Sequence, residues 1–486
     1  MAAATSHPAL RTGSAFAERL TIAMFCVFVP FTLGSSSMNF NDGDVSWHIA
    51  AGRWIIEHGA VPSVDIFSLT KAGEPWVPIE WLAEVVFGGA FAINGYGAVA
   101  AIVSLALVAL NLVLLLYLRR RASTVQILLS MVALYLVLIP FLLARPHVLA
   151  WPLLAGWTVI LLRAREQGTS PPLWAAALML LWANVHGSWA LGGAIAAAFA
   201  IEALIEARWS RKALAGWIGF GLASAFAAIL TPQGVDGFLH PLRVAQMQTL
   251  PLIVEWRPSD PGRTPLLFAV LVMVIAAALW RGLRLTPVRA MLIAGLVGLA
   301  LLQMRHQSVL AIVAVLLLAE PFASQREPSV AIGPDEGRAA ALWLGLLIAL
   351  LALVRLVMPL VPAQNDANPR DALAAIPADL RSKPVFNGYT IGGPLILAGI
   401  RPFIDGRADL YGDRFVTDYK QIIDGDMVAF DAAAKRWKIA WTILPADDKG
   451  LLPKLDRSPQ WHRLYADKAA VIHVRNDALT PPGRAD

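Results

Sequence analysis

Eleven apolar stretches recur along this chain, and they limit the folds open to it more than any other feature. A helix of roughly 20 residues crosses a hydrocarbon core about 30 Å thick, and shorter helices reach across when interfacial residues flank them. The sequence therefore predicts an α-helical polytopic membrane protein with about eleven transmembrane helices. They are expected at residues 16–37, 96–118, 124–143, 147–163, 172–186, 189–207, 213–231, 264–281, 288–304, 307–323 and 339–361.

The composition agrees with a chain solvated by lipid. Apolar residues make up 57% of the 486 residues, charged residues only 15%, and the mean hydropathy is +0.60. A formal net charge of +6 does not indicate nucleic-acid binding, because the basic residues lie at the ends of the apolar stretches. We expect the membrane as a partner and no nucleic acid.

The distribution of Lys and Arg predicts the orientation, since these residues concentrate in cytoplasmic loops. If the N-terminus is cytoplasmic, fifteen of them fall in inner segments and seven in outer loops before residue 362. An odd number of crossings then places the C-terminal stretch outside the cytoplasm. The sequence thus predicts a multi-pass protein of the cytoplasmic (inner) membrane with an extracytoplasmic C-terminal domain.

Two units are expected. Residues 1–361 form the transmembrane bundle, with a large first outer loop at 38–95, and residues 362–486 form the C-terminal domain. Short apolar runs at 384–386, 402–404, 439–444 and 470–474 are typical of strands, and residues 391–399 and 416–438 have helical patterns. Strands and helices in this order predict a small α/β domain.

The first outer loop begins with a D-x-D pair, Asp42 and Asp44. If Asp44 caps the following helix, His48 lies one turn along on the same face, while Trp47 and Trp54 share another face suited to the lipid interface. Oxygen ligands of this kind suit Mg²⁺ or Mn²⁺, so Asp42, Asp44 and His48 are a possible metal site. Alternatively, the aspartates only cap and turn the chain.

Further polar residues recur at the predicted outer ends of the helices. Glu80 and Glu84, one helical turn apart in the same loop, either line a site or face water. Four more outer corners carry Arg145 and His147, Asn184 and His186, Glu255, and Arg305 and His306. For any one corner, a polar turn at the interface is the ordinary interpretation, but the inner corners hold plain Arg and Lys. Because the four outer corners all carry such residues on the same side of the membrane, the sequence predicts that they share one site.

Cationic side chains in this set suit a phosphate at the membrane surface, because a guanidinium binds phosphate oxygens through two parallel hydrogen bonds. The candidates are Arg145, His147, Arg305 and His306. In the C-terminal domain, Asp405, Arg407 and Asp409 alternate with small residues. They either recognise a substrate from above the membrane or form an Asp-Arg pair that locks the loop.

These residues carry a family resemblance. The pattern D-G-D-x-x-W-H-I-x-x-G-R-W-I-x-x-H-G-x-V-P-x-x-D-x-F-S at residues 42–68 is followed by Glu80-Trp81-Leu82. With Arg145-Pro146-His147, residues 184–187 and residues 403–409, it resembles bacterial multi-pass proteins of the GT-C glycosyltransferase superfamily. Members similar to dolichyl-phosphate-mannose-protein mannosyltransferases use polyprenyl-phosphate sugars. The resemblance covers most of the chain.

The resemblance implies a GT-C-like helical bundle with a soluble extracytoplasmic domain and a polyprenyl-phosphate-linked sugar as donor. It implies a catalytic acidic residue in the first outer loop, which corresponds to Asp42 or Asp44, and some members of the superfamily use a metal. One displacement, with a carboxylate base and cations on the leaving phosphate, inverts the anomeric centre. His48, Glu80, Asn184, His186, Glu255, Asp405, Arg407 and Asp409 are expected to bind substrate, and the acceptor is a glycan, a lipid or a protein.

Two other functions are compatible with such a chain. A transporter or flippase of lipid-linked substrates would carry charges or broken helices at mid-membrane, and Arg355 is the one charged residue expected there. A non-catalytic scaffold would only present the C-terminal domain.

Overall fold

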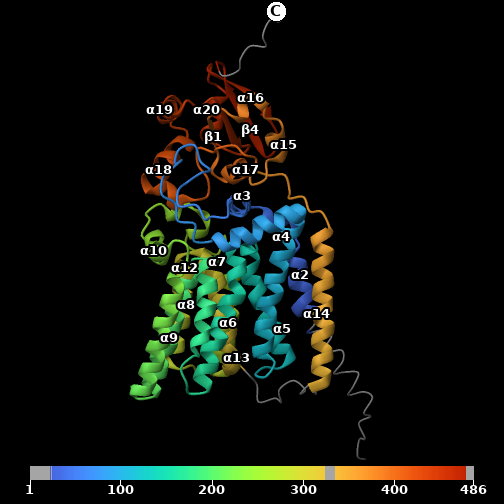
Figure 1. Cartoon of the computed structure of the whole chain (residues 1–486), viewed down its shortest axis with the longest axis vertical. Helices are drawn as coiled ribbons and strands as arrows, with labels where there is room; N and C mark the ends of the chain where they lie inside the picture. Colours follow the sequence, from blue (N-terminus) through green and yellow to red (C-terminus); the bar gives the residue numbers. More distant parts are fainter. Residues whose placement is uncertain (1–21, 23, 323–333, 478–486) are drawn as a thin grey trace, which may run out of the picture.

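The computed structural model describes residues 22, 24–322 and 334–477, and it consists mostly of helices. A bundle of long helices stands below a smaller domain that contains the sheet (Figure 1). Arg11, Arg19 and Arg326, together with the first residues of the first expected span, lie outside the described residues.

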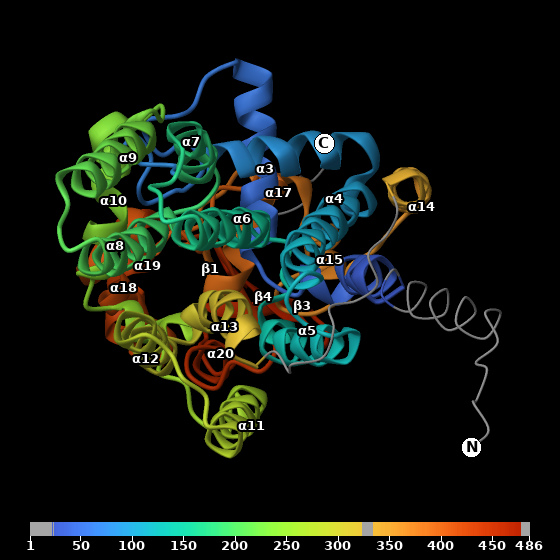
Figure 2. The same ribbon diagram turned by 90° about the horizontal axis from the view of Figure 1, so that it is seen from below.

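Within the residues that the structure describes, six helices are long and apolar enough to cross a membrane. They are α4 (Trp81–Leu118), α5 (Thr124–Leu138) continued by η3 (Ile139–Phe141), α6 (Pro146–Glu166), α8 (Trp189–Glu206), α9 (Arg211–Ile229), and η7 (Met304–His306) continued by α13 (Gln307–Phe322). Figure 2 shows the bundle from below, with most helices seen close to end-on.

Five shorter apolar helices accompany them among the described residues. They are η1 (Met24–Phe28) with α2 (Val29–Gly34), η4 (Leu173–Ala175) with α7 (Ala176–Val185), α11 (Pro265–Arg281), α12 (Pro287–Leu302) and the part of α14 (Pro334–Val357) from Ala341 onward. Every expected span overlaps an apolar helix, but in the described part of the chain six helices combine the length and hydropathy needed to span a membrane alone. The number of eleven crossings therefore stays a prediction. Arg355 lies in the last turn of α14, not at its middle.

Non-spanning helices lie at the end of the bundle next to the sheet domain (Figure 1). They are η2 (Ser37–Phe40), α3 (Asp44–His58), α10 (Gly234–Ala245), η5 (Leu250–Leu252) and η6 (Val254–Trp256). Glycines allow α3 to touch α4, because a Cβ at Gly52 would lie only 1.7 Å from the carbonyl oxygen of Glu84. Trp47, expected at the lipid interface, instead is buried against Trp76 and Ile396.

The C-terminal domain is built on a mixed four-stranded sheet with the order β1-β2-β4-β3. Its strands are β1 (Val385–Asn387), β2 (Trp441–Pro445), β3 (Trp461–Ala466) and β4 (Ala470–Arg475). β1 pairs in parallel with β2 through Phe386 and Thr442, and the other two pairs are antiparallel. The helices are α15 (Arg370–Ala374), α16 (Ala378–Arg381), η8 (Tyr389–Ile391), α17 (Gly392–Leu397), α18 (Ala408–Ile423), α19 (Met427–Trp437) and α20 (Leu452–Leu455).

One expectation for this domain is wrong in detail. Residues 402–404 form a loop rather than a strand, because they bond to the first outer loop and to the Asn387 side chain, which accepts the Phe403 N–H at 2.8 Å. The helical pattern at 416–438 corresponds to two helices, α18 and α19, which are separated at Gly425 with φ of 105°. β3 escaped the sequence reasoning because most of its residues are exposed.

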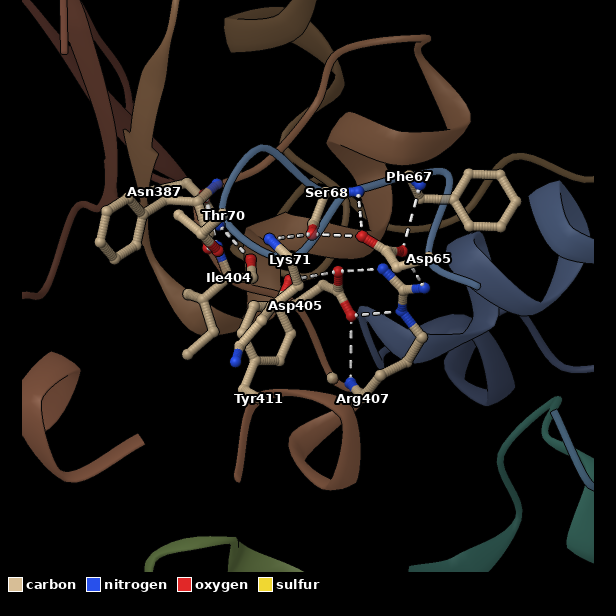
Figure 3. Close-up of polar contacts among 12 residues, drawn as sticks. Asp65, Phe67, Ser68, Thr70, Lys71, Asn387, Ile404, Asp405, Arg407 and Tyr411 are labelled. Atoms are coloured by element: carbon tan, nitrogen blue, oxygen red, sulfur yellow. Dashed lines mark hydrogen bonds and ion pairs between the residues drawn. The ribbon is translucent and has the colours of Figure 1, made fainter. Parts of the chain in front are cut away.

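A buried ion-pair network joins the first outer loop to the C-terminal domain (Figure 3). The Arg407 guanidinium donates through Nε and Nη2 to both carboxylate oxygens of Asp405, and through Nη1 to Asp65 at 2.7 Å. Tyr411 donates to the same Asp405 carboxylate at 2.8 Å. Because all of these side chains are buried, the network is a lock rather than a solvated surface pair.

Replacing Arg407 with Leu is expected to destabilise this junction strongly. The change leaves Asp65 and Asp405 buried without their cation, which costs on the order of 3–5 kcal/mol. Thermal unfolding and limited proteolysis of the purified protein in detergent measure the effect. Arg414→Leu, an exposed arginine on α18, is the matched control, and equal stability of the two variants would contradict the lock.

Candidate active site

A cavity of about 1000 Å³ lies between the bundle and the C-terminal domain. This volume is at the upper end of the range for small-molecule sites. Apolar side chains of the bundle, among them Trp151, Leu154, Leu302 and Val309, line one part of it, and C-terminal residues such as Tyr389 and Tyr419 line another. The cavity therefore offers an apolar wall and a polar wall to one ligand.

The structure brings most of the predicted site residues to this cavity from separate parts of the chain. The lining includes Asp42, Asp44, Glu80, Arg145, His147, His186, Glu255, Arg305, His306, Arg407 and Asp409. It does not include His48, Asn184 or Asp405. The five corners expected to share a site are thus neighbours in space.

Three carboxylates converge on Arg145. Its Nη1 atom lies 3.3 Å from Asp42 Oδ2 and 2.6 Å from Glu255 Oε2, and its Nη2 atom lies 3.0 Å from Asp44 Oδ2. Pro146 is the first residue of α6, so Arg145 stands at the end of that helix with an extended backbone. Arg145 was expected to bind phosphate, but carboxylates take its two Nη atoms.

The two aspartates differ in their surroundings. Asp42 Oδ1 accepts the backbone N–H of Asp44 at 2.8 Å and so helps to begin α3. Asp44 is the first residue of that helix, and Gly406 approaches it so closely that a Cβ there would lie 1.7 Å from Asp44 Oδ1. Only glycine at 406 leaves room for the Asp44 carboxylate.

Electrostatics separate Asp44 from Glu255. Burial raises the pKa of Asp44 to about 7, and neighbouring Asp42 and Glu255 add to the increase while Arg145 opposes it. Burial also favours the neutral form of Glu255, but Arg145 and Arg305 outweigh it and hold the pKa of Glu255 below its ordinary value. Of these two carboxylates, Asp44 is the one that can exchange a proton near neutral pH.

A second buried group alternates carboxyls and imidazoles. His48 Nδ1 lies 3.3 Å from Glu84 Oε1, and its Nε2 lies 3.7 Å from Glu80 Oε2. His186 Nε2 lies 3.3 Å from Glu80 Oε1, and its Nδ1 pairs with the Ser188 hydroxyl at 2.8 Å. Glu84 is 1% exposed, so of the two alternatives left open for it, facing water is the one that the structure excludes.

Burial keeps this group largely uncharged. It lowers the pKa of His48 and of His186 well below the ordinary value, with Arg145 and Arg305 respectively as the next contributions. Burial raises the pKa of Glu80 to about 7. The group is a hydrogen-bonded wall of the site rather than a set of cations.

Among the cationic side chains of the site, Arg305 has a guanidinium that no hydrogen bond or ion pair of the described residues occupies. Its guanidinium stacks on the Trp256 ring at 4.0 Å and forms no hydrogen bond or ion pair within the described ranges. His147 is tied through Nε2 to the Phe141 carbonyl oxygen at 2.8 Å, and His306 Nδ1 is buried without a protein partner there. Of the four predicted phosphate ligands, Arg305 is therefore the best placed to receive an anion.

Three predicted substrate ligands, Asn184, Asp405 and Arg407, make contacts within the protein. Asn184 accepts from Trp81 Nε1 at 2.7 Å and donates to the Leu180 and Leu230 carbonyl oxygens, so its amide is fully used away from the cavity. Asp405 belongs to the buried lock, as does Arg407, whose three donor nitrogens are all occupied. Two interpretations were open for this segment, substrate recognition and an Asp-Arg pair that locks the loop. The contacts of Asp405 and Arg407 are those of the Asp-Arg pair.

The residues expected to hold a metal do not fit one. His48 turns its ring to Glu84 and Glu80, whereas Asp42 and Asp44 share the Arg145 cation. Across the described part of the chain, no group of three or more His, Cys, Asp or Glu side chains is arranged to bind a metal ion.

Other site residues escaped the sequence reasoning. His240 Nε2 on α10 lies 3.4 Å from Asp409 Oδ2, across the cavity from the bundle helices. Asp65 was visible only as one letter of the first-loop pattern, and Tyr389 only as part of a glycine-rich segment. A partner hundreds of residues away gives no local signal, so only the fold reveals these contacts.

Comparison with solved structures identifies the fold. No protein-family model matches the sequence, and no curated protein matches it either. The structure is similar to the archaeal oligosaccharyltransferase AglB from Archaeoglobus fulgidus in complex with an inhibitory peptide and a dolichol-phosphate, with a TM-score of 0.54 and 10% identity over 97% of this chain and 75% of that one. It is also similar to the apo form of the Archaeoglobus fulgidus oligosaccharyltransferase, with a TM-score of 0.52 and 11% identity over 89% and 70% of the two chains. The chain therefore shares its fold with these oligosaccharyltransferase structures.

Proposed function

We propose that this protein is a membrane glycosyltransferase that moves a sugar from a polyprenyl-phosphate donor to an acceptor on the extracytoplasmic face. The observation that carries the proposal is the cavity, where an apolar wall, an unengaged guanidinium and a titratable carboxylate meet. The apolar wall suits a prenyl chain, the guanidinium a phosphate and the carboxylate an acceptor proton. The fold neighbours, one of them in complex with dolichol-phosphate, are consistent with this assignment.

The reaction we propose is a single displacement. Asp44 removes the proton of the acceptor hydroxyl, and the acceptor oxygen forms a bond to the anomeric carbon. The bond from that carbon to the phosphate oxygen breaks, and the electron pair leaves with the polyprenyl phosphate, whose new charge Arg305 stabilises. Attack opposite to the leaving group inverts the anomeric centre.

Asp44 rather than Asp42 is the base in this proposal. One Asp42 oxygen accepts the N–H that begins α3, and the other faces Arg145. Asp44 has the raised pKa that general-base catalysis near neutral pH requires. His186 and Glu80 form the adjoining wall and orient the substrate.

A donor panel tests the proposal. Purified protein is incubated with polyprenyl-phosphate sugars and with glycan, lipid and peptide acceptors, and products are identified by mass spectrometry. We expect one donor to yield an acceptor heavier by one sugar, with inverted anomeric configuration by NMR. If the donor instead crosses the liposome membrane and no acceptor product forms, the protein is a transporter. If neither transfer nor transport is detected, the remaining alternative is a non-catalytic scaffold.

The rate of transfer is expected to rise with pH and to level off above about 7. The Asp44 carboxyl must be ionised to accept a proton, and burial raises its pKa to about 7. At lower pH the protonated fraction grows and the rate falls about tenfold per pH unit. The measurement is a pH profile of kcat/KM, and Glu80→Gln should keep the same acid limb because Glu80 is not the base. A flat profile through pH 6 to 8 would contradict the assignment.

A further inference from the structure

Three carboxylates surround the guanidinium of Arg145 in the cavity. Asp42, Asp44 and Glu255 come from two different segments, yet all three place a carboxylate oxygen within 3.3 Å of one guanidinium. Neighbouring carboxylates repel one another unless a cation lies between them, and within the described residues these three are not spaced to hold a metal ion while the guanidinium is present. Between these three carboxylates the cation is the Arg145 guanidinium, which belongs to the chain itself.

We propose that Arg145 is the resident cation of this site and stands where a divalent ion would otherwise bind. The inference rests on the proposed function, since it concerns how the same site handles charge. Arg145 neutralises and orients Asp44 and Glu255, so transfer requires no Mg²⁺ or Mn²⁺. Arg145 is a positioning residue in this scheme, and Arg305 meets the phosphate.

A guanidinium suits this role physically. It is planar, permanently charged and carries five N–H donors. The two Nη atoms hold the carboxylates, and Nε is buried with no hydrogen-bond partner in the described residues. One donor is thus left for a ligand that enters the cavity.

Charge balance explains what loss of Arg145 would do. The carboxylates of Asp42, Asp44 and Glu255 all contact the Arg145 guanidinium, and Glu255 is also stabilised by the charge of Arg305. Without Arg145, three carboxylates remain close together around an empty position, and bringing in a cation relieves their repulsion. A variant that lacks the guanidinium should therefore acquire a divalent-ion site.

Mn²⁺ binding tests this without reference to transfer. Free Mn²⁺ is titrated against the full-length protein in detergent and followed by electron paramagnetic resonance. We expect Arg145→Ala to bind one Mn²⁺ at least about tenfold more tightly than the natural protein, and Asp42→Asn added to it to abolish that site. Arg243→Ala, which removes an arginine of α10 outside the cavity, should bind as the natural protein does.

Several outcomes would overturn the proposal. The proposal is overturned if the natural protein binds Mn²⁺ tightly and with 1:1 stoichiometry. This measurement does not depend on whether a variant folds. Failure of both Arg145→Ala and the longer Arg145→Gln to bind Mn²⁺, in samples monodisperse by size exclusion, also overturns it. If a donor is found, equal rates in EDTA and in Mg²⁺ support the proposal. If none of the donors reacts, the transferase assignment fails while the Mn²⁺ result stands by itself.

Discussion

Replacing Asp44 with Asn is expected to reduce sugar transfer by about 10²–10⁴-fold, the usual contribution of a positioned general base. The variant keeps the size of the side chain, so the close approach of Gly406 and the start of α3 are preserved. The substitution removes the carboxylate that takes the proton of the acceptor hydroxyl. Because the group acts in the chemical step, kcat should fall while the KM for the donor changes little.

Two variants separate this effect from a general disturbance. Asp42→Asn retains a side-chain oxygen for the Asp44 N–H, so its loss of activity should be clearly smaller. Asp236→Asn, at an exposed acid of α10, should leave the rate unchanged. If Asp42→Asn abolishes transfer and Asp44→Asn does not, the base is Asp42, and if both are active, this cavity is not the site of transfer.

The bundle could be predicted because hydrophobicity is local information. Each apolar stretch needs no distant partner to be recognised, and every expected span overlaps an apolar helix. Helix continuity was harder to predict. α4 begins at Trp81 and is broken by non-helical angles at Asn94 and Gly95, and the part after this break covers the expected span 96–118. The part before the break is also apolar and packs against α3, a contact that no local sequence signal reveals.

The site was predictable as a set of residues but not as a set of roles. Sidedness alone placed Asp44, Arg145, Glu255 and Arg305 on one face, and they do line one cavity. Their pairing is a property of the fold. Nothing in the sequence distinguishes Arg145, held by three carboxylates, from Arg305, which rests on Trp256.

Replacing Arg305 with Met is expected to reduce kcat/KM by about 10²–10³-fold, the scale for a lost charge-stabilising donor. The donor is a phosphodiester with one negative charge, and departure of the polyprenyl phosphate adds a second charge to the same phosphate. Arg305 therefore interacts more strongly with the transition state than with the bound donor, and kcat should fall together with affinity. Met retains the apolar stem over Trp256, so the loss reports on charge.

The comparison of Arg305→Lys with Arg305→Met isolates that charge. Lys carries a point charge without the planar fork, so it should restore part of the rate but not all of it. Arg257→Gln is the matched control. Arg257 lies next to the Arg305 segment, since its carbonyl oxygen accepts the Met304 N–H, but its side chain donates to the Pro251 carbonyl oxygen at 3.1 Å and does not line the cavity. If Arg305→Met transfers sugar as fast as Arg257→Gln does, the phosphate does not bind at Arg305, and the departing charge must be met elsewhere in the cavity.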